Sequence, residues 1–310
     1  MEAKLRRALG EQILAALDDP AVVEILLNPD GRLWVDIHGQ GQQEIGRMDA
    51  TRAESLIGTV AAGLGTVVNR DHPILEGELP LNGERFEGIL PPVSPSPVFS
   101  IRKRASQVFT LADYEAAGIL TAQQGEILRQ GVAERLNIVV AGGCSSGKTT
   151  LANALLAEAA CCGRAGERFV VLEDTVELQC PAANTVALRT SETADLTRLL
   201  RATLRLRPDR IIVGEVRGSE ALHLLKAWNT GHPGGITTLH ANSARAALTR
   251  LEQLIQEAGV AAQPALIAEA VNLIVFIGLT PSGRAVKEVA RVTGWTPDAG
   301  YVLTQTELSE

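Results

Sequence analysis

A glycine-rich segment, residues 142–149, has the residue types and the spacing of a loop that binds phosphate groups. It reads Gly-Gly-Cys-Ser-Ser-Gly-Lys-Thr and fits G-x-x-x-x-G-K-[ST] at every fixed position. An apolar run with β-branched residues precedes it at 136–141, and helix-forming residues follow it at 151–158. The glycines allow successive N–H groups to face phosphate oxygens, and the following helix adds the positive end of its dipole. The predicted phosphate site consists of Gly142, Gly143, Cys144, Ser145, Ser146, Gly147, Lys148, Thr149 and Thr150.

Two side chains of this segment have the chemistry to bind a nucleoside triphosphate and its metal ion. Lys148 would reach the β- and γ-phosphates, and the Thr149 hydroxyl would ligate Mg²⁺. A chance glycine-rich turn is the alternative, and the flanking strand and helix argue against it.

Three polar side chains stand where predicted strands end. Hydrolysis of a bound nucleotide requires a carboxylate that holds the metal and a group that orients water. Two apolar runs lead into Glu173 and Glu215, and a run that follows a Gly- and Pro-rich loop ends at His240. Because ligands of open α/β sheets bind beyond the carboxyl ends of the strands, we expect these side chains to face the phosphates. Solvated strand-end acids and a structurally satisfied histidine are the alternatives.

The elements that must position these groups alternate between strand and helix from residue 121 onward. This alternation predicts an α/β fold, with a mostly parallel sheet and helices on both faces. We expect strands over 136–141, 168–173, 185–188, 210–214, 235–239, 272–279 and 286–293. We expect helices over 121–133, 148–161, 193–206, 218–229, 243–258 and 263–270.

Residues 1–104 predict a smaller, separate α+β domain. Helices are expected over 3–17 and 51–64, the second with Thr51 as N-cap and Glu54 completing a capping box. Strands are expected over 22–27, 33–37, 74–79, 85–90 and 98–102. The pattern loosens between 105 and 120, where we place a linker, so that the phosphate-loop domain covers 121–310.

Composition and charge exclude several classes of protein. A net charge of −7 and a pI near 5.4 argue against a general nucleic-acid binder. No apolar run has the length of a membrane span, and the N-terminus has no apolar segment typical of a signal peptide. The four cysteines contain no C-x-x-C pair, so reduced cytoplasmic thiols fit best. These features predict a cytoplasmic protein.

The motifs together resemble those of the type II/IV secretion ATPase superfamily. The phosphate loop and the segments 173–175, 207–217 and 231–241 are similar to its Walker A, Asp box, Walker B and His box, in that order. The whole chain, including the turn Asn-Pro-Asp-Gly at 28–31, most resembles the TrbB-type conjugal-transfer ATPases of type IV secretion. The resemblance implies a RecA-like P-loop domain behind the smaller N-terminal domain, with nucleotide bound between the two domains.

The resemblance also implies roles for individual residues. Glu215 would orient or deprotonate the attacking water, and Glu173 would join Thr149 in the metal shell, although these two acidic roles could be exchanged and Glu215 is a candidate ligand too. His240 would sense the γ-phosphate. Arginines of the N-terminal domain would approach the phosphates, at positions matched by Arg85 and Arg102, with Arg104 as a neighbouring candidate.

By this resemblance the chain is expected to be an ATP-hydrolysing, Mg²⁺-dependent motor of a conjugative type IV secretion system. It would form a homo-hexamer, lie peripherally at the inner membrane and meet other secretion components there, without sequence-specific binding of nucleic acid. A type IV pilus or type II secretion motor is a rival, although the C-x-x-C pairs of many type II motors are absent. A DNA-translocating RecA-like motor is disfavoured by the acidic charge. The acidic pair and His240 argue against a nucleotide-dependent scaffold without turnover.

Overall fold

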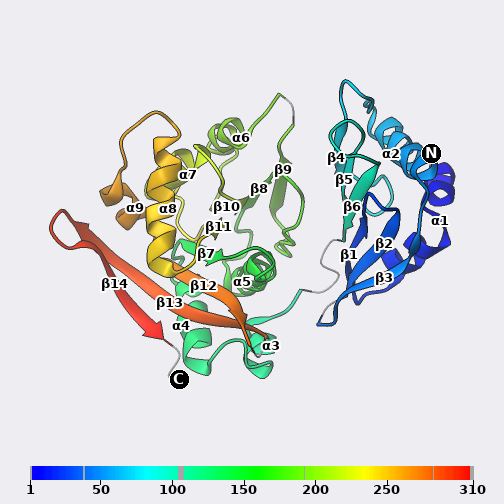
Figure 1. Ribbon diagram of the computed structural model, residues 1–310. Helices are drawn as coiled ribbons and strands as arrows, with labels where there is room; N and C mark the ends of the chain where they lie inside the picture. Colours follow the sequence, from blue (N-terminus) through cyan, green and yellow to red (C-terminus); the bar gives the residue numbers. More distant parts are fainter. Residues whose placement is uncertain (1, 38, 104–107, 192, 282, 308–310) are drawn as a thin grey trace. The chain divides into compact units, whose positions relative to one another are not determined.

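The chain forms two compact units, Met1–Gln107 and Val108–Glu310. The computed structural model describes residues 2–37, 39–103, 108–191, 193–281 and 283–307, with the backbone alone for 305–307. Arg104 and residues 105–107 therefore lie outside the described residues. Each unit has its own sheet and its own core, and we describe the two in turn (Figure 1).

The first unit is a six-stranded antiparallel sheet with two helices packed on one face (Figure 1). The strands are β1 (Val22–Leu27), β2 (Arg32–Ile37), β3 (Gly41–Arg47), β4 (Ile74–Glu78), β5 (Arg85–Ile89) and β6 (Val98–Arg102), in the order β3-β2-β1-β6-β5-β4. Helix α1 (Glu2–Asp18) is kinked at Gly10, which has a φ of 78°, and Leu5 and Leu9 before the kink and Ile13 after it all enter the core. Alternate strand residues meet them from the sheet, such as Ile25 and Ile101.

Two details of this unit differ from the sequence-based expectation. Helix α2 (Ala50–Leu64) is capped by Asp49, whose Oδ1 accepts the N–H of Arg52 at 2.9 Å. The predicted cap at Thr51 is therefore wrong, because Thr51 already lies in the first helical turn. Strand β3 was not predicted, because it is an exposed edge strand whose sequence, GQQEIGR, has no apolar alternation.

The second unit contains an eight-stranded sheet, ordered β14-β13-β12-β7-β11-β10-β8-β9. The strands from β12 to β9 run parallel, and β13 and β14 extend the sheet in antiparallel fashion. Their bounds are β7 (Ile138–Gly142), β8 (Phe169–Glu173), β9 (Thr185–Arg189), β10 (Arg210–Glu215), β11 (Ile236–His240), β12 (Leu273–Thr280), β13 (Gly283–Thr296) and β14 (Gly300–Glu307). The expected mostly parallel sheet is confirmed. Strand β14 was not predicted.

Helices cover both faces of this sheet, which explains why strand β7 is buried along its whole length (Figure 1). Val139 and Ala141 join one core with α6 (Leu196–Thr203), α7 (Glu220–Asn229), α8 (Ala244–Gln256) and α9 (Pro264–Ala270). Ile138 and Val140 join the other core with α3 (Leu111–Ala116), α4 (Ala122–Ala133) and α5 (Lys148–Cys162).

Part of the predicted linker belongs to the second unit. Helix α3 is closed by a capping box between Thr110 and Asp113, and Leu111, Tyr114 and Leu120 are buried in the core. The expectation of a linker over 105–120 is therefore wrong from residue 108 onward. The apolar residues of this short helix are too few to show a helical period in the sequence.

Buried charges brace the amino ends of the central strands. Glu167 and Arg210 are almost fully buried, with Glu167 Oε1 at 3.2 Å from Arg210 Nε and at 2.6 Å from Arg135 Nη1. Arg210 Nη1 also donates to the carbonyl oxygen of Gly234, in the loop before β11. Arg210 and Glu167 thus form a buried ion pair, which the partly exposed Arg135 joins, at the strand ends opposite to the phosphate loop.

Candidate active site

The phosphate loop connects the end of β7 to the start of α5. Gly147 has a φ of 95°, a conformation that favours glycine, at the residue before the helix. A Cβ atom on Gly142 would lie 2.5 Å from the carbonyl oxygen of Ile277, so only glycine fits there. The carbonyl oxygen of Gly143 accepts two hydrogen bonds, from Ser146 Oγ at 2.9 Å and from Lys148 Nζ at 2.8 Å. These bonds fold the loop around the ammonium of Lys148, which is only 8% exposed.

Parallel pairing brings His240 to the same loop. In the register of β11 and β7, His240 is the partner of Gly142. His240 Nε2 lies 3.4 Å from Lys148 Nζ and 2.9 Å from Glu215 Oε1. Lys148 of the phosphate loop and two of the three side chains predicted at strand ends, His240 and Glu215, thus lie together at the carboxyl ends of the strands, with His240 in contact with the other two.

Arg217, the last residue of the segment 207–217, extends this row of contacts, although no individual role was expected for it. Its Nε and Nη2 atoms donate to Glu215 Oε2, at 2.8 and 2.5 Å. Four side chains therefore form a continuous row in which each contacts the next. We call this row, Lys148–His240–Glu215–Arg217, the charged row. Within it, each oxygen of Glu215 has a nitrogen within hydrogen-bond distance.

The surroundings of His240 favour its neutral form. Burial lowers the pKa of the imidazole, the Lys148 ammonium lowers the pKa further, and the Glu215 carboxylate opposes these effects. Because the folded chain binds this proton more weakly than the unfolded chain, stability linked to His240 is fully present above the ordinary pKa of 6.5 and is lost as pH falls. A neutral His240 at pH 7 can both accept and donate hydrogen bonds.

We expect the His240 imidazole to titrate below pH 6.5 in the nucleotide-free protein, as followed by NMR of labelled histidine. In Lys148→Ala the midpoint should move upward, because a neighbouring positive charge has been removed. A midpoint at or above 6.5 in the unaltered chain would contradict this account of the site.

Glu173, at the end of β8, is 4% exposed and holds the backbone of the segment that follows it. Its Oε1 accepts the N–H groups of Glu177 at 2.9 Å and of Leu178 at 2.8 Å. The carboxylate in contact with Thr149 is that of Glu177, with Thr149 Oγ1 donating to Glu177 Oε2 at 3.3 Å. Glu177 could not be identified from the sequence, since no motif position or strand end distinguishes it.

A second missed residue lies at the other side of the loop. Arg284, on β13, directs Nε and Nη2 to the carbonyl oxygen of Ser145, each at 3.4 Å. Ser145 has a φ of 55°, which is unusual for a residue other than glycine. Arg284 could not be identified from the sequence because the strand was expected to begin at 286, two residues after it.

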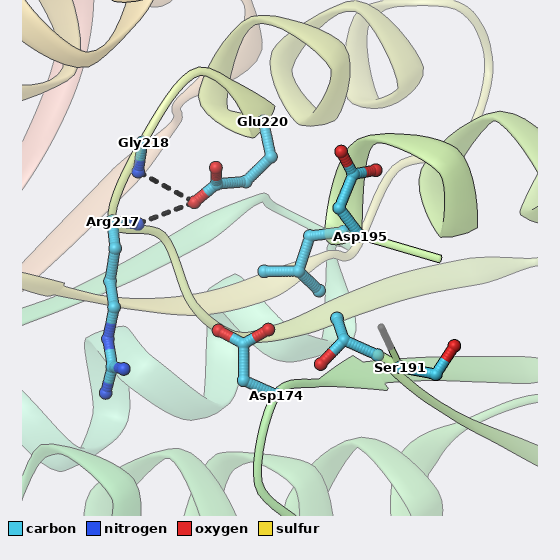
Figure 2. A pocket seen from close by; sticks show the side chains of 8 residues that line it. Asp174, Ser191, Asp195, Arg217, Gly218 and Glu220 are labelled. Atoms are coloured by element: carbon cyan, nitrogen blue, oxygen red, sulfur yellow. Dashed lines mark hydrogen bonds between the residues drawn. The ribbon is translucent and has the colours of Figure 1, made fainter. Parts of the chain in front are cut away.

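A pocket of about 450 Å³ includes Arg217 of the charged row in its lining (Figure 2). Asp174, Ser191 and Asp195 line the pocket from the other elements. The carboxylate of Glu220 turns back and accepts the N–H groups of Arg217 at 2.6 Å and Gly218 at 2.9 Å (Figure 2). This bond fixes the loop after β10 and hence the backbone that carries Arg217.

In the first unit, Arg85 and Arg102 are direct partners across β5 and β6. On the neighbouring strands, the residues paired with these arginines are acidic. Glu78 on β4 is opposite Arg85, and Glu24 on β1 is opposite Arg102. The row lies on the sheet face away from the core, since Phe86 and Ile101 point inward. The two arginines predicted from separate strands therefore form one basic pair, which we call the arginine pair.

The chain matches a family model described as type II/IV secretion system protein, over residues 67–298. The chain belongs to this family of secretion ATPases. The resemblance inferred from the motif order is thereby confirmed.

Individual secretion proteins show the same relationship. A probable conjugal transfer protein TrbB of Sinorhizobium fredii is 50% identical over 99% of this chain and 94% of its own length. The VirB11 ATPase of the Brucella suis type IV secretion system, solved with sulphate, is 27% identical, with a TM-score of 0.50 over 93% of this chain and 94% of that one. The pilus retraction motor PilT, solved with ADP, shares the fold at 20% identity, with a TM-score of 0.63 over 96% of this chain and 82% of that one.

These secretion ATPases share the two-domain α/β organisation described above, so the predicted fold class is confirmed. Among the residues that the structure describes, no helix has both the length and the apolar character of a membrane-spanning segment.

Proposed function

We propose that this secretion ATPase is the Mg²⁺-dependent motor of a conjugative type IV secretion system, where ATP hydrolysis drives assembly of the pilus or channel, or substrate transfer. The observation that supports this most strongly is the contact of Lys148 in the phosphate loop with His240, which in turn contacts Glu215. The similarity to conjugal transfer and type IV secretion proteins supports the biological setting.

The residues of the second unit fit a bound MgATP. The N–H groups of 142–150 would surround the phosphates, and Lys148 would leave the Gly143 carbonyl oxygen to follow the β- and γ-phosphates. The oxygen donors next to Lys148 suit Mg²⁺, since the Thr149 hydroxyl and a carboxylate are hard ligands. When bound, Mg²⁺ would supply neutralisation of charge on the β- and γ-phosphate oxygens.

Glu215 would act on the attacking water. The Glu215 side chain is 17% exposed, and its carboxylate contacts His240, which in turn contacts Lys148 of the phosphate loop. A carboxylate in this position can orient a water molecule or accept its proton. His240 in its neutral form would donate a hydrogen bond to the γ-phosphate, which would change its contact with Glu215. His240 would therefore both detect the γ-phosphate and contact Glu215, the proposed base.

The arginine pair would neutralise the triphosphate from the first unit. Like charges directly opposite each other destabilise a sheet, so pairing Arg85 with Arg102 has a cost that Glu24 and Glu78 offset in part. A bound polyphosphate would relieve the remaining repulsion. Nucleotide would then hold the first unit closed on the second, and hydrolysis would reopen it.

A closed ring of subunits would keep each first unit close to the bound nucleotide during this cycle. Head-to-tail contacts between identical subunits can generate such a ring. We propose a homo-hexamer in the cytoplasm, peripheral at the inner membrane, where other secretion components would contact it. Sequence-specific binding of nucleic acid is not part of this proposal.

We expect Arg102→Ala to reduce ATP turnover by on the order of tenfold or more, with Arg85 left to supply part of the charge. The ring should persist, and in the unaltered protein the specific ATPase rate should rise with protein concentration. Light scattering and rate measurements across a dilution series test both statements.

The matched control is Arg47→Ala, which removes an exposed arginine from the same sheet. Equal turnover in the Arg102 and Arg47 variants would remove the arginine pair from the mechanism. A monomer that is fully active at every dilution would reject the ring and leave the phosphate loop in place.

A further inference from the structure

Arg284, at the start of β13, contacts the phosphate loop at two places. Its Nε and Nη2 atoms both donate to the carbonyl oxygen of Ser145, each at 3.4 Å. The aliphatic part of the same side chain packs beside Gly147, since a Cβ atom on Gly147 would lie 3.3 Å from Arg284 Cδ. Arg284 thus contacts both ends of the segment 145–147, which leads into α5.

The two loop residues that Arg284 contacts have left-handed backbone conformations. The φ angle is 55° at Ser145 and 95° at Gly147. Glycine adopts this conformation readily, whereas the Cβ atom of serine disfavours it. A contact that holds Ser145 in this conformation therefore stabilises the shape of the loop, and the two hydrogen bonds from Arg284 to its carbonyl oxygen are such a contact.

The strand that carries Arg284 is held by two neighbouring segments. Val286, two residues further along β13, is paired with Ile277 of β12. On its other side, Val286 donates its N–H to the carbonyl oxygen of Ile119 at 2.8 Å, and its carbonyl oxygen accepts Nε2–H of Gln124 at 3.1 Å. Because Arg284 and Val286 are two residues apart on a strand, they share one face of the sheet. Val286 belongs to the core that contains α5, so Arg284 lies on the face where the phosphate loop continues into that helix.

The contact with Arg284 determines where the next N–H group of the loop points. In a planar trans peptide, the carbonyl oxygen and the N–H that follows it lie on opposite sides. Because the carbonyl oxygen of Ser145 faces Arg284, the N–H of Ser146 is directed away from Arg284. A hydrogen bond to the carbonyl oxygen also polarises the peptide, which makes this N–H a stronger donor. The N–H groups of such a loop are its phosphate-binding groups.

The geometry points to Arg284 as a positioning residue that presents the N–H of Ser146 to a phosphate oxygen of the bound nucleotide. This inference rests on the proposed function, since it assumes that nucleotide binds at the phosphate loop. Arg284 acts through the backbone of the loop and does not have to touch the nucleotide. The hydrogen bonds to Ser145, rather than the charge of the guanidinium, therefore raise the affinity of the loop for phosphate.

Two substitutions of similar length separate the hydrogen bond from the charge. In Arg284→Gln the amide nitrogen takes the place of Nε along the side chain and can still donate to Ser145, whereas Arg284→Met has no donor. The measurement is binding of a fluorescent, non-hydrolysable ATP analogue with Mg²⁺ to the full chain. We expect Arg284→Met to weaken binding by about tenfold, the effect of losing one hydrogen bond from a charged group. Arg284→Gln should stay within about threefold of the unaltered chain.

Lys287→Met is the matched control, because it removes another cation from β13, one whose Nζ atom lies 6.0 Å from the centre of the Phe276 ring. This variant should bind the analogue as the unaltered chain does. Arg284 is exposed, so its substitution should leave the core intact. In ATP hydrolysis, Arg284→Met should raise KM by about tenfold and change kcat by less than about threefold, since the lost contact acts on ground state and transition state alike.

The inference is overturned if Arg284→Met binds the analogue normally. It is also overturned if Arg284→Gln is as defective as Arg284→Met, because the charge would then act on the phosphates directly. Equal weakening in Lys287→Met would reduce the effect to net charge, and a fall in kcat with KM unchanged would place Arg284 in the chemical step. An unaltered chain that binds no nucleotide would instead reject the proposed function, and this inference with it.

Discussion

Replacement of Lys148 by alanine should abolish ATP turnover and weaken ATP binding by on the order of a hundredfold or more. Lys148 is 8% exposed as a residue, its ammonium donates to the carbonyl oxygen of Gly143, and no other residue of the loop 142–150 has a cationic side chain. Burial, the largest effect on His240, still lowers the pKa of its imidazole after Lys148 is removed, so His240 is a poor replacement for the lost positive charge.

Calorimetric titration with ATP measures the loss of affinity, and a phosphate-release assay measures turnover. The fold should persist, since the substitution removes a buried charge rather than a core side chain. Lys226→Ala, which removes an exposed lysine from α7, is the control for the change in net charge. An affinity for ATP equal to that of the unaltered chain would refute the assignment of the phosphate loop.

Glu215→Gln should retain MgATP and slow its hydrolysis by on the order of a hundredfold or more, the range of a general base. The amide still offers an oxygen to Arg217 and a donor to His240, so the geometry of the charged row should survive. What is lost is the ability to accept a proton from water. Binding and chemistry should therefore separate in this variant, whereas both fail in Lys148→Ala.

Single-turnover kinetics with pre-bound MgATP isolates the chemical step in this variant. Glu173→Gln is the informative partner, because the two acidic roles were left exchangeable by the sequence. Normal turnover in Glu215→Gln combined with none in Glu173→Gln would move the role of base to Glu173. Normal turnover in both would refute the argument from the acidic pair.

The parts of the fold that could be predicted are those with a strong local signal. The central strands β7, β8 and β10 contain continuous apolar runs, β11 combines apolar residues with two threonines, and helix α5 follows a glycine loop with fixed spacing. Edge strands could not be predicted in the same way. Strand β3 is polar and exposed, and β14 is the edge strand of the second sheet, beyond the turn at 297–299.

The candidate site shows the same division. Lys148, Glu215 and His240 occupy loop or strand-end positions that a motif identifies, and the sheet brings them into contact. Glu177 and Arg284 owe their positions to a segment without regular structure and to an antiparallel strand at the other side of the loop. Their contacts depend on tertiary packing between distant parts of the chain, which has no local sequence pattern.

The charged row has a consequence for how mutational data on this protein should be interpreted. Each member touches the next, so removing one changes the hydrogen bonds and the electrostatic field of its neighbours. Free energies obtained from single substitutions at Lys148, His240, Glu215 and Arg217 will therefore not sum to the effect of a combined variant. The coupling energy between adjacent members of the row can be measured directly by double-mutant cycles. A rate defect in one variant therefore reports on the whole row and not on the replaced residue alone.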